Sequence, residues 1–179
     1  QIGFTREGGT TSGAIFSRSD LTGETHLMAR LEEMDEGLAS FLRDWETPDV
    51  PGSAWVTPPP AGERRVALIS SAGLKLPGDR PFSEGSNDYR AIPAERAKEV
   101  VMDHISVSHD RTGFHHDVNI VFPLERLQEL AQEGVISSVA DFHYSFMGAT
   151  DPNEMEAQAR QLAGVMKADG VNTVVLAPV

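Results

Sequence analysis

The stretch Val171-Asn172-Thr173-Val174-Val175-Leu176-Ala177-Pro178-Val179 is dominated by β-branched and apolar residues and predicts a buried β-strand. Before it, Asp151 and Pro152 are the residue types of a helix N-cap and a first helical position, which predicts a helix over 152–168. Gly170 supplies the stop signal between the two elements. A helix followed by a buried strand in this way is the repeating unit of an α/β sheet. Because ligands of open α/β sheets bind beyond the carboxyl ends of the strands, that edge is where we expect a site.

Other short apolar runs alternate with helical patterns along the chain. Arg65-Val66-Ala67-Leu68-Ile69-Ser70-Ser71 predicts a first strand, and Pro123 begins a helical pattern that runs through Glu133 to the stop signal at Gly134. Further short strands are expected at 88–92, 105–108 and 135–139. The pattern predicts an α/β fold, with an open, mostly parallel sheet and flanking helices in Rossmann-like layers. We expect the C-terminal part of this sheet to be missing from the chain.

Three segments differ in composition. Residues 1–27 are rich in Gly, Thr and Ser and lack a sustained apolar period, which predicts a disordered or non-native extension, with translation starting at Met28. Residues 28–62 combine a short amphipathic helix with a Pro-rich linker. Residues 63–179 contain the α/β pattern and are expected to form one incomplete domain.

Composition excludes several classes of function. A formal net charge of −12 argues against nucleic-acid and anionic-membrane binding, because both partners would repel the chain. No apolar run approaches the ~20 residues that span a bilayer. The absence of cysteine excludes disulfides and a thiol nucleophile within these 179 residues. Without a signal-peptide pattern, the expected location is the cytoplasm.

Polar residues gather between 103 and 151. Residues 103–117 contain four of the six histidines. His104, Ser106 and Ser108 alternate along the predicted strand, so they would share one face. A polar face of this kind fits either a substrate pocket or a solvent-exposed edge strand.

Several chemical interpretations of these residues stay open. Imidazole and carboxylate suit Zn, Fe or Mn, but the spacing here matches no closed metal motif. A Ser–His–Asp hydrolase would need a G-x-S-x-G elbow, which is absent. A phosphate site before the helix at 152–168 is opposed by the acidic Asp151. A salt-bridged surface turn is the non-functional alternative. The residues considered as metal ligands are His104, His109, His115, His116 and Asp117.

Four motifs then occur in a recognisable order. They are Asp103-His104-x-Ser106, Asp110-Arg111-Thr112-Gly113-Phe114-x-x-Asp117-x-Asn119, Phe122-Pro123-Leu124-x-Arg126-Leu127 and His143-Tyr144-Ser145-Phe146-Met147-Gly148. In this order the chain resembles the selenoprotein B family, which covers glycine, sarcosine, betaine and D-proline reductases and short stand-alone relatives. The resemblance runs from about 64 to 179, and the tetrad at 145–148 is its most specific part.

The resemblance implies a reductase chemistry. A selenocysteine or cysteine would follow the strand that matches 173–179, in a Cys/Sec-x-x-Cys type of motif. Its ionised form would attack a carbon bearing an amine, leading to reductive cleavage of the C–N bond. We therefore expect no cofactor within this chain, a Sec/Cys motif downstream that a UGA codon read as a stop would hide, and no activity from the chain alone.

Candidate roles for individual side chains follow from their chemistry. His104 and His143 are the candidate catalytic acid–base residues, because imidazole titrates near neutral pH. Arg111 is the candidate for a bidentate contact with a substrate carboxylate. The other substrate-binding candidates, as ion-pairing or hydrogen-bonding groups, are Ser106, Asp110, Asp117, Tyr144 and Ser145.

The expected function is that of a subunit or stand-alone member of a selenoprotein-B-like reductase acting on a small amino acid or amine. Expected partners are that small-molecule substrate and either a second reductase subunit or another copy of the chain. A bare final strand also favours dimerisation or aggregation. Two alternatives stay open: a complete, His-rich, metal-dependent hydrolase, and a non-catalytic partner module.

Overall fold

The computed structural model describes residues 31–46, 49, 52, 56–106 and 111–179. The chain divides into two compact units, Gln1–Glu46 and Thr47–Val179. The predicted extension at 1–27 and the proposed start at Met28 lie outside the described residues.

The described part of the first unit is a short helical segment. A 3₁₀ turn, η1 (Leu31–Glu33), precedes helix α1 (Glu36–Arg43). The Asp35 carboxylate caps α1 by accepting a hydrogen bond from the Gly37 N–H at 2.9 Å. The amphipathic helix predicted in this region is therefore present, although it is broken between η1 and α1.

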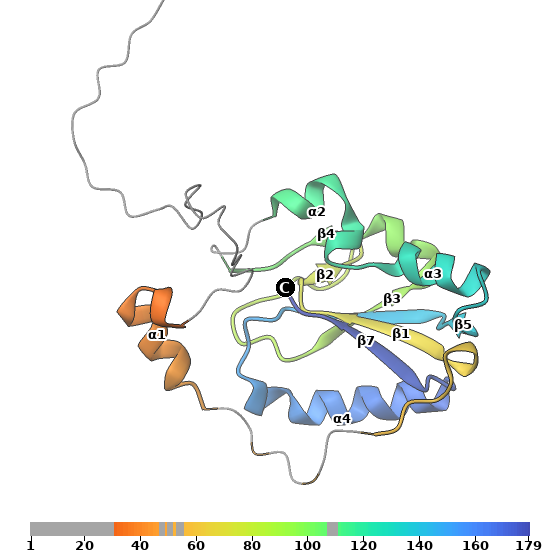
Figure 1. The fold of residues 1–179 in the computed structure, drawn as a ribbon. Coiled ribbons are helices and arrows are strands. Elements are labelled where there is room, and N and C mark those ends of the chain that lie inside the picture. The colour runs from red at the N-terminus through yellow and green to blue at the C-terminus, as the bar shows by residue number, and fades with distance from the viewer. Residues whose placement is uncertain (1–30, 47–48, 50–51, 53–55, 107–110) are drawn as a thin grey trace, which may run out of the picture. The chain divides into compact units, whose positions relative to one another are not determined.

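The second unit is built on a mixed, mostly parallel sheet (Figure 1). Its central strand is β1 (Arg65–Ser70), which pairs in parallel with β7 (Thr173–Ala177) on one side. On the other side β1 pairs in parallel with β5 (Ser138–Val139) and then with β6 (Phe142–Phe146). Strand β3 (Tyr89–Pro93) lies antiparallel beyond β6. The predicted α/β fold with a mostly parallel open sheet is confirmed.

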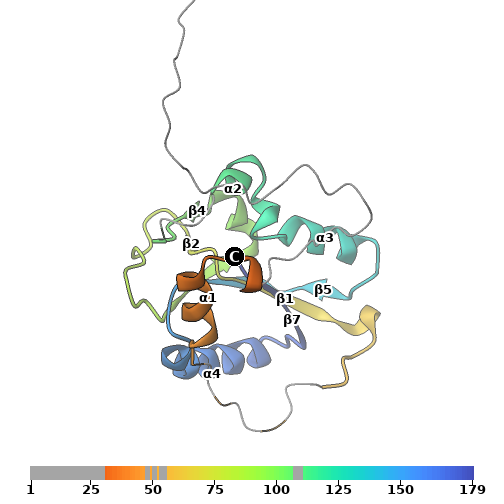
Figure 2. The same ribbon diagram turned by 60° about the vertical axis from the view of Figure 1, so that its left-hand side comes forward.

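Helices cover both faces of this sheet, which is visible in both views (Figures 1 and 2). On one face, Val66 and Leu68 of β1 join a core with Leu124 and Leu127 of α3 (Leu124–Gln132). On the other face, Ala67 packs in a second core that includes Leu162 and Met166 of α4 (Pro152–Ala168). The alternation of β1 side chains between two covered faces explains why its sequence is almost continuously apolar.

The remaining short elements of this unit lie mainly in the connection between β1 and β5. Strands β2 and β4 form a separate antiparallel pair. These elements are η2 (Ala61–Glu63), β2 (Leu74–Lys75), η3 (Ala94–Glu99), β4 (Val101–Met102), α2 (Thr112–His116) and η4 (Val118–Ile120).

Two local predictions need correction. Ile105 and Ser106 lie in irregular chain rather than in a strand, and 107–108 fall outside the described residues. The second correction is β6, which was not predicted as a strand. Its polar side chains His143 and Ser145 point into the core, where His143 Nδ1 and Ser145 Oγ accept hydrogen bonds from backbone N–H groups.

None of the helices in the described part of the chain combines the length and the apolar character needed to cross a membrane.

Candidate functional site at the carboxyl edge of the sheet

The connections that leave β1 and β6 run to opposite faces of the sheet. After β1 the chain enters β2, where Leu74 belongs to the core on the α3 face. After β6 it enters α4, which covers the other face. Because β1 and β6 are parallel neighbours, their carboxyl ends form a topological switch point, the usual ligand position in open α/β sheets.

The turns after these two strands pack directly against each other. The Gly73 N–H donates to the Phe146 carbonyl at 2.8 Å. Gly148 has a φ of +85°, and a Cβ atom there would lie 2.4 Å from the Ser71 carbonyl oxygen. Position 148 therefore requires glycine both for its backbone conformation and for the approach of the β1 turn.

The loop after β4 continues this backbone packing on the other side of Gly73. Gly73 has a φ of +64°, and a Cβ atom there would lie 2.9 Å from the Cα of His104. The Asp103 N–H also donates to the Gly73 carbonyl at 2.8 Å. We call the resulting arrangement of 147–148, 71–73 and 103–104 the glycine stack.

The end of β7 is fastened to the same turn. The Val179 N–H donates to Ser71 Oγ at 2.9 Å, and the Ser71 N–H donates to the Ala177 carbonyl at 3.2 Å. The carboxyl ends of β1, β6 and β7 therefore meet around Ser71, which was not singled out from the sequence.

Arg111 holds the loop after β4 in place. Its Nη2 donates to the His104 carbonyl at 2.5 Å and to the Ser106 carbonyl at 3.3 Å. His104 is buried, and its Nδ1 accepts a hydrogen bond from the Ser106 N–H at 3.1 Å. Three predicted site residues are thus brought together, and the contacts they make here shape the loop.

Two polar side chains of β6, His143 and Ser145, make hydrogen bonds within the core on the α3 face. Ser145 Oγ accepts from the Leu74 N–H at 2.8 Å and donates to the Phe146 carbonyl at 3.3 Å. The fully buried His143 accepts the Leu68 N–H at its Nδ1, at 3.0 Å. Its ring meets Phe122 edge to face, and its Nε2 has no hydrogen-bond partner among the described residues. Burial lowers the pKa of His143 to about 4, so this imidazole is neutral near pH 7.

Tyr144 lies on the opposite face of the sheet from His143. Its ring meets Tyr89 edge to face with the ring centroids 5.6 Å apart, in the core under α4. Burial raises the pKa of its hydroxyl. Because successive residues of a strand point to opposite faces, the structure does not bring Tyr144 together with His143 or Ser145.

Asp117 is an exposed capping residue for η4. Its Oδ1 accepts hydrogen bonds from the Asn119 N–H and from Asn119 Nδ2, both at 2.9 Å. These bonds hold the pKa of Asp117 below its ordinary value. Asp110, its predicted alternative as a partner for Arg111, lies outside the described residues.

The described residues do not assemble a metal site. Within 31–46, 49, 52, 56–106 and 111–179, no group of three or more His, Asp or Glu side chains is arranged to hold a metal ion. His115 and His116 are exposed at the end of α2, and His109 lies outside the described residues. Among the described residues, the predicted ligands are therefore not assembled into a group that could hold a metal ion.

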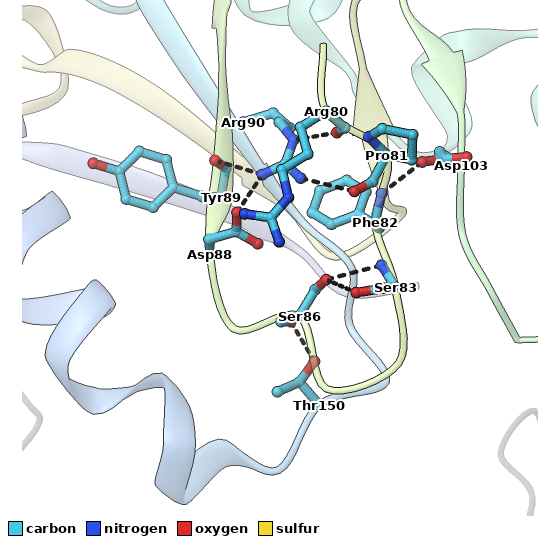
Figure 3. Close-up of polar contacts among 10 residues, drawn as sticks. All are labelled: Arg80, Pro81, Phe82, Ser83, Ser86, Asp88, Tyr89, Arg90, Asp103 and Thr150. Atoms are coloured by element: carbon cyan, nitrogen blue, oxygen red, sulfur yellow. Dashed lines mark hydrogen bonds and ion pairs between the residues drawn. The ribbon is translucent and has the colours of Figure 1, made fainter.

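A loop that borders this edge was also missed from the sequence. Residues 76–88, which we call the wall loop, are held by Arg90 of β3 (Figure 3). The Arg90 guanidinium donates to the Arg80 carbonyl at 2.9 Å and to the Pro81 carbonyl at 3.3 Å. It also pairs with Asp88 at 2.8 Å and lies 4.2 Å from the centre of the Phe82 ring. An arginine within an otherwise apolar strand was the signal that could have revealed this contact.

The wall loop is also tied to both neighbouring segments of the edge. Thr150 Oγ1 donates to the Ser86 carbonyl at 2.6 Å, which joins the loop to the turn between β6 and α4. Asp103 Oδ2 accepts the Phe82 N–H at 2.7 Å, which joins it to the loop after β4. The wall loop therefore stands in a fixed position beside the glycine stack.

An open sheet with a switch point between β1 and β6 places the protein in the class of α/β domains whose ligand sites lie at the carboxyl edge. Comparison with known families then gives the assignment. The model of the glycine/sarcosine/betaine reductase selenoprotein B family matches residues 60–179, and the chain belongs to that family. The resemblance inferred from the four motifs is confirmed.

Curated relatives agree with the assignment. The D-proline reductase subunit gamma of Acetoanaerobium sticklandii is 30% identical over 135 residues, covering 68% of this chain and 54% of that relative. A glycine reductase complex component B subunit gamma of Carboxydothermus hydrogenoformans is 27% identical over 117 residues, covering 62% of this chain and 27% of that relative. The chain thus spans about half the length of the first and about a quarter of the second. No solved structure matches it significantly.

Proposed function

We propose that the chain is part of a reductase subunit that cleaves the C–N bond of a small amino acid or amine at the carboxyl edge of its sheet. The observation that carries the proposal is the convergence on Ser71 of the ends of β1, β6 and β7, in a chain whose residues 60–179 match the selenoprotein B family. The relatives are named as subunits of D-proline and glycine reductases, which supports action within a larger assembly.

The reactive chalcogen would come from residues that follow β7. This chain contains no cysteine, whereas the chemistry requires a selenolate or thiolate nucleophile. That group would form a bond to the substrate carbon while the C–N bond breaks and nitrogen leaves with its electron pair and takes up a proton. Ser71 supports this placement, because its hydrogen bond fixes Val179 beside the switch point.

Arg111 is the side chain that we assign to the substrate carboxylate. A guanidinium carries five N–H donors, and Arg111 uses Nη2 for its hydrogen bonds to the His104 and Ser106 carbonyls. It is half-buried next to the glycine stack, where a carboxylate contact would add to its hold on the loop. Lysine at position 111 would keep the positive charge but lose the planar, bidentate donor geometry of the guanidinium. Arg111→Lys should therefore raise KM more than it lowers kcat.

The test begins with the coding sequence beyond the Val179 codon and continues with the natural full-length protein. We expect an in-frame TGA or cysteine codon soon after Val179. The purified protein, with its associated subunits and a dithiol reductant, should release ammonia or an amine from glycine, sarcosine or betaine, or open the ring of D-proline. No release from any of these substrates, with the assembly intact, would contradict the proposal.

A non-catalytic subunit is the second candidate. The observation that favours it is that Ser145 and His143 both hydrogen-bond to backbone N–H groups in the core. In that case, the assembly would keep full activity when Arg111 is changed to lysine and when any chalcogen codon after Val179 is changed to serine. Loss of activity in the serine variant would exclude this candidate.

A further inference from the structure

The segment 31–46 presents an apolar face to solvent. Phe41 is 56% exposed, Leu42 43%, Trp45 42% and Leu31 37%. Phe41 and Leu42 lie in the last turn of α1, and Trp45, which follows the end of the helix, packs its ring against Phe41, so the exposed surfaces of Phe41 and Trp45 are contiguous. Clusters of exposed aromatic and aliphatic side chains of this kind mark binding surfaces.

The side chains of this segment already contact one another in the unbound chain. The Phe41 and Trp45 rings meet edge to face with their centroids 5.0 Å apart. On the polar side, Arg43 pairs with Glu36 at 3.2 Å, and Ser40 Oγ donates to Asp44 at 3.2 Å. A helix that is already capped and internally bonded loses less conformational entropy on binding. Tryptophan is also among the residues that most often dominate interface energetics.

The charge of the segment indicates what kind of surface it fits. Residues 31–46 contain six carboxylate side chains and a single arginine, Arg43, which is already paired with Glu36. Because these carboxylates far outnumber the one arginine, and the whole chain has a formal net charge of −12, a second copy of this same segment would be repelled from it. Electrostatic complementarity therefore requires a partner whose apolar groove is bordered by lysine or arginine.

We propose that 31–46 is a docking helix that binds an apolar, basic-rimmed groove on another subunit of the reductase assembly, which makes the inference rest on the proposed function. Helix-in-groove binding of this type places apolar anchors on one side of a helix, here Phe41 and Leu42 of α1, with Trp45 packed against Phe41 just beyond the helix end. The helix lies outside the family match, which covers residues 60–179. Five prolines at 48, 51 and 58–60 separate it from β1, a composition that favours an extended spacer.

The experiment uses the natural full-length protein, affinity-tagged in its host and purified at low salt, with co-purifying subunits identified by mass spectrometry. The identified partner subunit is then bound to immobilised wild-type and variant protein. The double variant F41A/W45A should bind at least about 30-fold more weakly. The matched control S40A, on the polar side of the same helix, should bind like wild type.

A second set of measurements covers the case in which F41A/W45A does not fold. The charge variant E32Q/E33Q/E46Q keeps the apolar face and should associate about tenfold more slowly, with a weaker dependence on salt. A photo-crosslinking residue in place of Leu42 should label a partner peptide that contains lysine or arginine.

The outcomes separate the two proposals. If wild-type protein purifies without any reductase subunit, the proposed function and this inference both fail. If the wild-type assembly forms and folded F41A/W45A keeps wild-type affinity, only the docking helix is wrong. A crosslink to another copy of this chain, or to an acidic peptide, would also overturn the inference.

Discussion

The two edges of the main sheet differ in how they meet solvent. Strand β3 ends at Pro93, which has no N–H to offer another strand, and its Arg90 is buried beneath the wall loop. Strand β7 contains neither charge nor proline, and its Val174 and Leu176 are 38% and 68% exposed. Within the described residues, β7 pairs with β1 and with no other strand. Natural proteins protect free edges with prolines, charges or covering segments.

Within the described residues, the β3 edge is therefore protected by a proline, a covering loop and a buried guanidinium, whereas the β7 edge carries no such protection. The β3 side carries the wall loop and a buried guanidinium, and the interlocked turns of the glycine stack lie at the carboxyl edge, so changes in either should unfold the domain. The β7 side carries an uncharged strand, so changes on its exposed face should alter association instead. The predictions below compare changes at the two edges with changes at the carboxyl ends and the centre of the sheet.

The largest effect is expected from Gly148→Ala in the glycine stack. A Cβ at 148 would collide with the Ser71 carbonyl at 2.4 Å, and φ is +85°. The free energy of unfolding should fall by about 4 kcal/mol, measured by urea denaturation. The control Gly134→Ala, where φ is +72° and a Cβ meets open space, should cost about 1 kcal/mol. Equal losses in the two variants would mean that the turns are not interlocked.

Removal of the Arg90 guanidinium should have the next largest effect. Arg90→Met leaves the carbonyls of Arg80 and Pro81 without this donor and should lower the free energy of unfolding by about 3 kcal/mol. The wall loop should also become more sensitive to protease. Arg96→Met is the control, because it breaks only the exposed pair with Glu99 and should change little. If Arg90→Met were as stable as wild type, the buried guanidinium would not be what stabilises the β3 edge.

Acid should destabilise the centre of the sheet through His143. Its pKa is about 4 when folded and about 6.5 when unfolded, so between these values the unfolded chain binds more protons. Stability from this group is full above about pH 6.5 and falls as the pH drops towards 4. We expect a loss of about 2 kcal/mol between pH 7 and pH 5. His143→Gln should be less stable at pH 7 but should lose less over this interval; an unchanged pH slope would contradict the assignment.

The smallest effect on stability is expected at the β7 edge. Leu176→Lys should change the free energy of unfolding by no more than about 0.5 kcal/mol, because the side chain is 68% exposed. It should, however, reduce self-association or aggregation measured by light scattering. Val175→Lys is the matched control at the neighbouring position. Because Val175 packs against the core on the α3 face, this substitution should lower the free energy of unfolding by about 2 kcal/mol. Identical scattering of Leu176→Lys and wild type would show that this edge does not drive association.

The sequence predicted best those elements whose ends carry strong local signals. The helix over 152–168 is confirmed at both ends, because Asp151 caps it and Gly170 adopts a φ of +74° after it. Strand β6 could not be predicted from its pattern, because His143 and Ser145 make it look polar. Their partners are backbone N–H groups of Leu68 and Leu74, which lie about 70 residues away in the sequence.

The structure brings some of the candidate site residues together and separates others. His104, Ser106 and Arg111 do lie together, because the motif residues share one loop. Tyr144 lies on the opposite face from His143, as the period of a strand requires once β6 is recognised. The roles of Ser71 and Arg90 depend on contacts with residues distant in the sequence or on main-chain atoms, which residue types alone do not reveal. The catalytic roles of His104 and His143 stay predictions.

The glycine stack also explains how the geometry of this edge can persist while sequences diverge. Gly148 meets the main chain of Ser71, and Gly73 meets the main chain of His104, so side-chain size sets neither spacing. Substitutions at positions around the two glycines can therefore accumulate without moving the end of β7 relative to the loop after β4. The main chain thus acts as the ruler of this edge, and the surrounding side chains are free to determine which molecule it binds.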